Sequence, residues 1–362
     1  MFIHITVLLF VCIVGMYFYW TPCRKKKNAN IYFVSICMLP IWIIQTIRAE
    51  TVGIDTPSYV RSFSVINQKG LSWEELNWEK GYVLLNRLVW FLFGNNYHFL
   101  LGMVSFIILL GIGYFILNNT QNSETFWAMF LFVTLNHYLT SMVSLRQYCA
   151  IAIGINAFTI LDKKKCFKNY IFASLICILA LMFHNSAIVF VCVLLPSFFK
   201  RVNKKIFLSI VGISVLVFCS IDKIIQIMGL ILPSYRVYLY GAHELSAGVQ
   251  FANSYIILLM GKVLLIVLVF CLNEKEAKSI YNLSLYMLVG IFCSLLTTKM
   301  AVFFRLTYYF DIYLIIYIPK VLGKLSGIKI RRGFFALVFI LAIVYYIYTL
   351  YTNCSKCVPY VI

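Results

Sequence analysis

Residues 98–117 read HFLLGMVSFIILLGIGYFIL, a run of twenty positions without a single Asp, Glu, Lys or Arg. An α-helix needs about 20 predominantly apolar residues to cross the hydrocarbon core of a bilayer. This stretch therefore predicts a transmembrane helix. It decides the fold class because similar runs recur before and after it.

The composition of the whole chain agrees with that stretch. Of its 362 residues, 62% are hydrophobic and 12% are charged, whereas soluble domains have about 25% charged residues. This balance excludes a soluble domain, a disordered chain and a disulfide-stapled secreted module. We expect an all-α, polytopic integral membrane helix bundle that forms a single transmembrane domain over residues 1–362.

Apolar runs of span length predict about 12 transmembrane helices. Segment 81–94 is apolar but short and contains Arg87, so we interpret it as an interfacial or re-entrant helix. The expected spans are 2–20, 31–47, 98–117, 124–141, 143–161, 169–183, 186–199, 206–221, 254–272, 280–298, 302–319 and 333–351.

The net charge of +19 gives the orientation of the bundle. In a soluble protein such a charge would suggest nucleic acid, but in a membrane protein Lys and Arg collect in cytoplasmic loops. Five short segments hold 19 of the 31 Lys and Arg residues, and an even number of spans between them places both termini and the loops 48–97 and 222–253 outside. No nucleic-acid partner is expected. The five basic segments are 24–27, 163–168, 200–205, 273–279 and 320–332.

Polar residues near the outer ends of the spans stand out, because a charge at mid-membrane costs about 2.5–3.5 kcal/mol on insertion scales. Each has two interpretations. Asp55 caps a following helix or lies with Arg48 at the mouth of a site. Arg146 snorkels to the interface or binds an anion, and His184 is structural or a general base. Glu79 belongs to a surface helix or contacts a lipid headgroup.

Deeper in the membrane, Asp311 lies six residues beyond Arg305 and needs a partner. Lys262, in another expected span, is the obvious one, and we expect these two side chains to form a buried structural ion pair.

The outer-face residues are informative together. Three arginines, a carboxylate and a histidine on one side of a bundle suit a substrate that carries a pyrophosphate, because arginine donors neutralise a diphosphate leaving group without a metal. The sequence contains no zinc motif, P-loop or GxSxG motif, and we expect neither a metal nor another cofactor. The converging residues are Arg48, Asp55, Arg146, His184 and Arg305.

These same residues resemble the EpsG family, a branch of the Wzy-like exopolysaccharide and O-antigen polymerases. The order and spacing of the matching pieces hold from residue 48 to residue 310, although Ile54 stands where the family often has a small or polar residue. The matching pieces are Arg48, Val52-Gly53-Ile54-Asp55-Thr56, Tyr59, Glu79-x-Gly81-Tyr82, Ser144-Leu145-Arg146-Gln147, His184-Asn185-Ser186-Ala187, Arg305 and Tyr308-Tyr309.

The resemblance implies a glycosyltransferase in the bacterial cytoplasmic (inner) membrane. Such a polymerase joins polyprenyl-diphosphate-linked oligosaccharide repeat units on the outer face, in exopolysaccharide, capsule or O-antigen biosynthesis, with membrane lipid around it and a flippase and a chain-length regulator as further partners. It implies His184 and Asp55 as catalytic candidates. The residues it implies for substrate binding are Arg48, Arg146, Arg305, Glu79, Gln147 and Tyr308.

Two other functions stay open. Another membrane glycosyltransferase or ligase with a lipid-phosphate donor is compatible with Glu74-Glu75, since a carboxylate there could act as base. A transporter or flippase of lipid-linked oligosaccharides needs access to both sides and often has an internal repeat. The sequence shows no such repeat, and its unusual polar residues gather on one side, which counts against transport.

Overall fold

The computed structural model describes residues 1–26, 28–68, 78–192, 204–220, 223, 253–278, 280–297 and 303–362. All regular secondary structure in these ranges is helical, which confirms the all-α prediction. The chain divides into two compact units. Unit 1 comprises Met1–Ser197 and Gly333–Ile362, and unit 2 comprises Phe198–Arg332. Whether the chain acts as the single domain expected from sequence stays a prediction.

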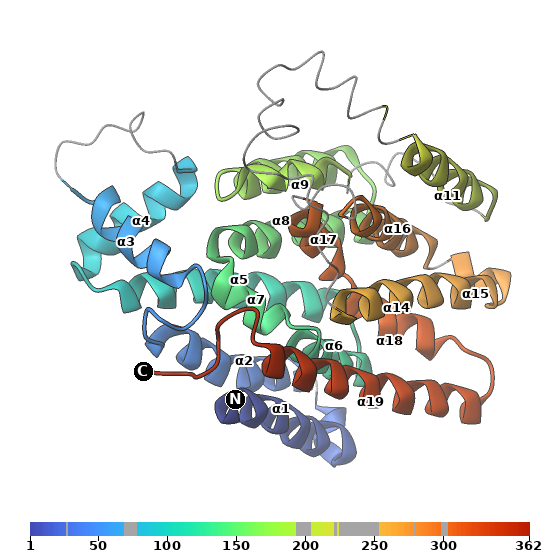
Figure 1. Cartoon of the computed structure of the whole chain (residues 1–362). Coiled ribbons are helices and arrows are strands. Elements are labelled where there is room, and N and C mark those ends of the chain that lie inside the picture. The colour runs from blue at the N-terminus through green and yellow to red at the C-terminus, as the bar shows by residue number, and fades with distance from the viewer. Residues whose placement is uncertain are drawn as a thin grey trace. The chain divides into compact units, whose positions relative to one another are not determined.

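Unit 1 is built on a row of long helices in which α9, α8, α5, α2 and α1 pack side by side in that order (Figure 1). α5 is apolar on all sides and lies inside the row, as expected for residues 98–117. The elements of unit 1 are α1 (Phe2–Trp20), η1 (Pro22–Lys25), α2 (Ala29–Ile47), α3 (Thr56–Ile66), α4 (Lys80–Phe93), α5 (Tyr97–Asn119), α6 (Ser123–Thr134), α7 (His137–Val143), α8 (Leu145–Lys163), α9 (Phe167–Leu181), η2 (Asn185–Phe190) and most of α19 (Ile328–Thr352).

Within the described residues, four helices are long and apolar enough to cross a membrane, namely α1, α2, α5 and α19. The pair α6 and α7 makes a fifth if it is one broken span, because the two helices meet at an angle of 48°. The expected span 124–141 is therefore not continuous. Asn136 breaks it by adopting a left-handed backbone conformation (φ 65°), which asparagine tolerates better than most residues.

The count of about 12 spans is not confirmed. The described chain has further apolar helices of 10–17 residues, and the expected span 302–319 is split at Ile312–Tyr313. The expected span 186–199 begins with the short 3₁₀ helix η2, and its residues after 192 lie outside the described residues. Helix α4 has 14 residues and is about 21 Å long, too short for the ~30 Å core, as predicted for segment 81–94.

Unit 2 is centred on α16, which packs against α11, α14 and α17. Its interior contains the ion pair predicted from sequence: Lys262 Nζ lies 2.6 Å from Asp311 Oδ1, and the two side chains are 1% and 6% exposed. Lys262 also donates to Ser294 Oγ at 3.0 Å. The described helices of unit 2 are α11 (Lys204–Cys219), α14 (Asn253–Phe270), α15 (Glu274–Lys278), α16 (Tyr281–Leu296), α17 (Phe303–Asp311) and α18 (Leu314–Gly323).

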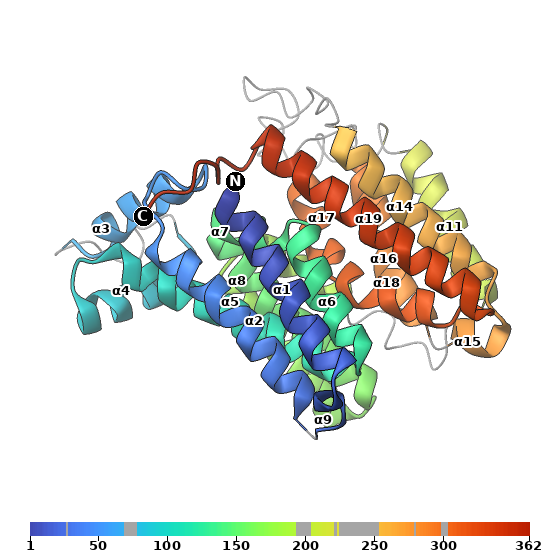
Figure 2. The same ribbon diagram turned by 90° about the horizontal axis from the view of Figure 1, so that it is seen from below.

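The last helix returns the chain to unit 1. On α19, Phe335 packs on Trp127 and Phe339 stacks on Phe130, with ring centroids 4.8 Å apart in both pairs. The segment after α19 then reaches the start of α1, and the two labelled ends of the chain lie close together in both views (Figures 1 and 2).

Candidate active site

Glu79 stands at the N-cap position of α4, where a close approach between two helices places it. The N–H of Gly81 donates to the carbonyl of Met182, just after α9, at 2.8 Å. A Cβ on residue 81 would lie 2.7 Å from that carbonyl oxygen, closer than side chains are found. Only glycine lets α4 begin so near the end of α9. The Glu79 side chain consequently reaches the turn that carries His184.

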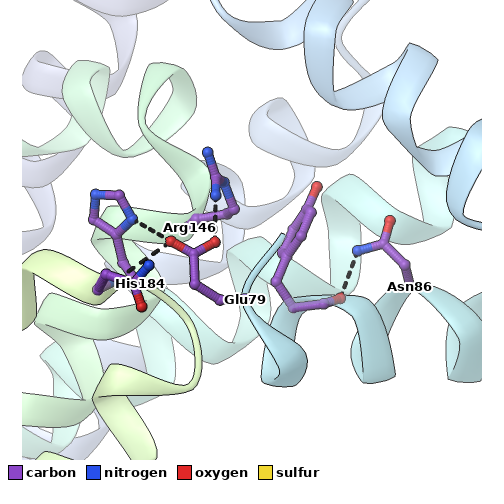
Figure 3. Close-up of polar contacts among 6 residues, drawn as sticks. Glu79, Asn86, Arg146 and His184 are labelled. Carbon is purple, nitrogen blue, oxygen red and sulfur yellow. Dashed lines mark hydrogen bonds and ion pairs between the residues drawn. The ribbon is translucent and has the colours of Figure 1, made fainter. Parts of the chain in front are cut away.

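The Glu79 carboxylate joins an arginine and a histidine from two other elements (Figure 3). Its Oε1 accepts a hydrogen bond from His184 Nδ1 at 2.9 Å and another from the Asn185 N–H at 3.3 Å. Its Oε2 forms an ion pair with Arg146 Nη1. The carboxylate side chain is 7% exposed, whereas Arg146 and His184 are 23% and 19% exposed. The acid is therefore buried and its two partners are partly open.

The hydrogen bonds fix the chemistry of the histidine. An ionised carboxylate only accepts hydrogen bonds, so His184 Nδ1 carries the proton and Nε2 keeps its lone pair in the neutral ring. Burial raises the pKa of Glu79, but the hydrogen bond from His184 and the charge of Arg146 outweigh it and lower that pKa to about 2. Glu79 is thus ionised at neutral pH, and Nε2 is available as a base.

Aromatic rings hold the other side of Arg146. Its guanidinium carbon lies 4.4 Å from the ring centroid of Trp78 and 5.9 Å from that of Tyr82, within reach of a cation–π interaction. Tyr59, on α3, packs edge-on against Tyr82 with centroids 6.0 Å apart. Burial raises the pKa of Tyr59, and the neighbouring Arg146 charge opposes this rise.

The two tyrosines near Arg146 are not placed to stack on a sugar ring. Tyr59 and Tyr82 are 7% and 0% exposed because they pack in the interface between α3 and α4. Trp73, and the acidic pair Glu74-Glu75, lie outside the described residues.

Arg48 and Asp55 occupy different surroundings from the Glu79 cluster. Arg48 is fully buried, and its guanidinium donates to the carbonyls of Gln45 and Met142, the latter at 3.0 Å. Asp55 is the N-cap residue of α3, but its side chain makes no capping hydrogen bond. Within the described residues, no hydrogen bond or ion pair joins either side chain to Glu79. Their roles toward substrate stay predictions.

The remaining predicted site residues are distributed over both units. Gln147 is buried on α8, next to Arg146 in the sequence. Arg305 and Tyr308 lie on α17 in unit 2, where Arg305 is exposed and the Tyr308 ring packs edge-on against Phe304. The predicted meeting of Arg305 with Arg146 therefore stays a prediction.

Sequence reasoning underestimated Glu79, which it treated as one substrate contact among several. The structure makes Glu79 the residue that links two predicted site residues. The pattern Glu79-x-Gly81 was the signal for this role of Glu79. It places an acid at the start of a helix, and two residues later it places the small residue that a close helix contact requires. The described residues contain no group of three or more His, Cys, Asp and Glu side chains placed to hold a metal ion.

The span-forming helices define a multi-pass membrane protein, and the buried carboxylate that contacts a histidine and an arginine is its candidate site. The chain belongs to the EpsG family, whose family model matches residues 31–362, nearly its whole length. This confirms the resemblance read from the motifs. EpsG is a Wzy-like polymerase family, so the general function is that of a membrane polysaccharide polymerase. Searches of curated proteins and of solved structures gave no match.

Proposed function

We propose that this protein joins polyprenyl-diphosphate-linked oligosaccharide repeat units by glycosyl transfer on the outer face of the bacterial cytoplasmic membrane, in exopolysaccharide, capsule or O-antigen biosynthesis. The observation that carries the proposal is the hydrogen bond from His184 Nδ1 to the Glu79 carboxylate at 2.9 Å. In the proposed topology both termini lie on the outer side of the membrane.

The acid–base step follows from that hydrogen bond. His184 Nε2 takes the proton from a hydroxyl of the acceptor repeat unit as the hydroxyl oxygen attacks the anomeric carbon of the growing chain. The bond between that carbon and the diphosphate oxygen breaks, and polyprenyl diphosphate leaves with the bonding electrons. The Glu79 carboxylate holds the ring in the required tautomer and stabilises the imidazolium that forms.

Arg146 supplies the positive charge for the leaving group. Its planar guanidinium can bind two oxygens of a diphosphate and so counter the charge that develops as the bond breaks. Glu79 and Trp78 fix the guanidinium before substrate arrives, so little reorganisation is needed during the reaction. Arg305, with Tyr308, is proposed to bind the second diphosphate. Arg48 and Asp55 order the outer loop and contact sugar or phosphate, and Gln147 contributes to substrate binding in this proposal.

The proposal is tested with the purified protein in proteoliposomes supplied with a polyprenyl-diphosphate-linked repeat unit, the products being separated by length on a gel. We expect His184→Ala, Glu79→Gln and Arg146→Ala to lower the polymerisation rate about 100-fold or more, since a positioned general base contributes about 10²–10⁴-fold. Arg305→Ala tests the proposed diphosphate-binding role of Arg305 in the same assay. Single repeat units should remain while long chains disappear.

Two control variants change the same residue types at exposed positions of the same outer region. Glu50→Gln, in the turn after α2, and Arg61→Ala, on α3, should leave the ladder of chain lengths unchanged. The proposed site is wrong if His184→Ala, Glu79→Gln and Arg146→Ala all retain the chain lengths of the unaltered protein. Transfer of the glycan to an acceptor other than a second lipid-linked unit would instead indicate a ligase.

A further inference from the structure

The segment Asn353–Ile362, which follows α19 and is called the tail below, is bonded along the motif segment 48–55. The N–H groups of Ala49, Gly53 and Ile54 donate to the tail carbonyls of Val361, Lys356 and Ser355, at 2.9, 2.8 and 3.0 Å. These are main-chain contacts at both ends of the segment that carries Arg48 and Asp55. The tail therefore determines the path of a segment about 300 residues earlier in the chain.

Side chains fasten the tail from two further directions. His4 Nε2 lies 3.0 Å from the carbonyl oxygen of Cys357, which can only accept, so Nε2 is the donor and Nδ1 accepts from the hydroxyl of Tyr138 at 3.1 Å. The hydroxyl of Tyr360 donates to the carbonyl of Ile44, in the last turn of α2, at 2.7 Å. Cys357 is 1% exposed. Cys357 thus anchors the tail in unit 1, whereas Cys354, Lys356, Pro359, Val361 and Ile362 stay exposed.

The tail also encloses Arg48. In the part of the chain that the structure describes, Arg48 forms no ion pair with a carboxylate, and its Nε has no hydrogen-bond partner. Burial lowers the pKa of Arg48 to about 10, although Cys357 and Tyr360 act in the opposite direction, so the side chain stays charged at neutral pH. Burying a charge without a counter-ion is costly unless hydrogen bonds compensate for the lost water, so Arg48 depends on the two carbonyls that it bonds and on the backbone that places them.

From Arg48 the contacts lead to both sides of the candidate active site. Arg48 Nη2 donates to the carbonyl of Met142, four residues before Arg146. A Cβ on residue 53 would lie 3.4 Å from the same carbonyl oxygen, and Gly53 has a left-handed conformation (φ 99°) that disfavours a side chain. The segment then enters α3, whose Tyr59 lies 6.5 Å from Trp78 between ring centroids. Contacts thus lead from segment 48–55 to the turn before Arg146 through Met142, and to Trp78 through α3.

We infer that the tail Asn353–Ile362 is a positioning element that locks segment 48–55 and, through it, sets the placement of Arg146 and Trp78. No residue of the tail has to touch substrate for this role. The consequence for catalysis rests on the proposed function, whereas the structural role of the tail does not.

The structural role is tested by trypsin cleavage after Arg48, followed by mass spectrometry of the full chain and of a chain that ends at Thr352. We expect the shortened chain to be cut after Arg48 at least tenfold faster. Lys262, buried in unit 2, is the internal control for global unfolding and should stay uncut. If Lys262 is also cut, the shortened chain has unfolded as a whole. The variant Tyr360→Phe then decides whether the tail protects Arg48, because it removes a single hydroxyl and leaves the rest of the tail in place.

Tyr360→Phe should accelerate cleavage after Arg48 by about threefold to tenfold, and Tyr351→Phe is the matched control because Tyr351 is 82% exposed on α19. Wild-type protection of Arg48 in the Tyr360→Phe chain and in a shortened chain that keeps Lys262 uncut would overturn the inference.

The effect on catalysis is a separate measurement. In the polymerisation assay, Tyr360→Phe should lower kcat severalfold with KM for the lipid-linked unit unchanged, and Tyr351→Phe should change neither. A synthetic peptide NCSKCVPYVI added to the shortened chain should restore both activity and protection of Arg48. Loss of protection together with an unaltered kcat would overturn the catalytic part of the inference. If the unaltered protein makes no polymer, the proposed function fails, while the cleavage result still decides the role of the tail.

Discussion

The two units each contain a buried ion pair, and the pairs differ in what surrounds them. In unit 2, Lys262 and Asp311 are 1% and 6% exposed, and the further contact of Lys262 is the hydroxyl of Ser294. In unit 1, Glu79 is buried but its partners Arg146 and His184 are 23% and 19% exposed. The first pair has both charges enclosed, whereas the second presents a cation and a histidine outward from a buried acid.

This difference separates a structural pair from the pair that we propose acts on the substrate. When both partners of an ion pair are enclosed, neither can contact a substrate. Lys262 and Asp311 therefore link their helices, α14 and α17. Burying only the central acid fixes two side chains whose outer atoms can still meet a substrate. His184 Nε2 illustrates the second case, since it makes no hydrogen bond within the described residues.

The largest effect is expected from breaking the pair in unit 2. Lys262→Met or Asp311→Leu alone leaves an uncompensated buried charge and should lower the free energy of unfolding by about 3–5 kcal/mol. The double variant removes both charges and should recover most of that loss. Unfolding in detergent by chemical denaturant measures all three. Polymerisation per folded molecule should be unaffected in the double variant, and a double variant as unstable as the singles would contradict the structural interpretation.

The pair in unit 1 should show itself in the pH dependence of stability. Because the pKa of Glu79 is lowered from 4.5 to about 2, its ionised form stabilises the fold at neutral pH, and this contribution falls as the pH drops from 4.5 toward 2. Glu79→Gln has no ionisable group at this position, so its stability lacks this dependence on pH. The melting temperature of the unaltered protein should exceed that of Glu79→Gln by a few degrees at pH 7, and the difference should shrink at pH 3.

Glu50→Gln, at an exposed position, is the control for that experiment and should follow the unaltered protein at both pH values. A difference between the unaltered protein and Glu79→Gln that is the same at pH 7 and pH 3 would mean that ionisation of Glu79 does not stabilise the fold.

The sequence predicted the helical class, the Lys262–Asp311 pair and the family, and each rested on a local signal. Apolar runs of span length predict helices because the bilayer offers no other partner for the backbone. Asp311 needed a cation, and Lys262 was conspicuous in an apolar run. The breaks at Asn136 and at Ile312–Tyr313 were missed, although polar residues mark both of them, because each stretch is apolar enough over its whole length to be predicted as one span.

The sequence could not predict which outer-face residues meet. Arg48, Arg146 and His184 were grouped by topology alone, but the structure puts a carboxylate between the last two and encloses the first under the tail. Such contacts depend on packing between helices distant in sequence, as the close approach at Gly81 shows. The tail contains only the short pattern Cys354-x-x-Cys357, a weak signal, and most of its contacts use carbonyl groups, which every residue has.

The smallest effect should come from the aromatic side of Arg146, and it shows how much of the positioning is ionic. Trp78→Leu removes a cation–π interaction worth about 0.5–1 kcal/mol at a partly exposed site, so kcat/KM should fall by about twofold to fivefold. Trp78→Phe keeps a ring face and should fall less. Glu79→Gln is expected to cost about 100-fold because it releases both His184 and Arg146, whereas Trp78→Leu measures the aromatic contribution to holding Arg146 alone. If Trp78→Leu costs as much as Glu79→Gln, the ring and not the carboxylate fixes the position of the Arg146 guanidinium. The ion pair in unit 1 would then not be what prepares Arg146 for substrate.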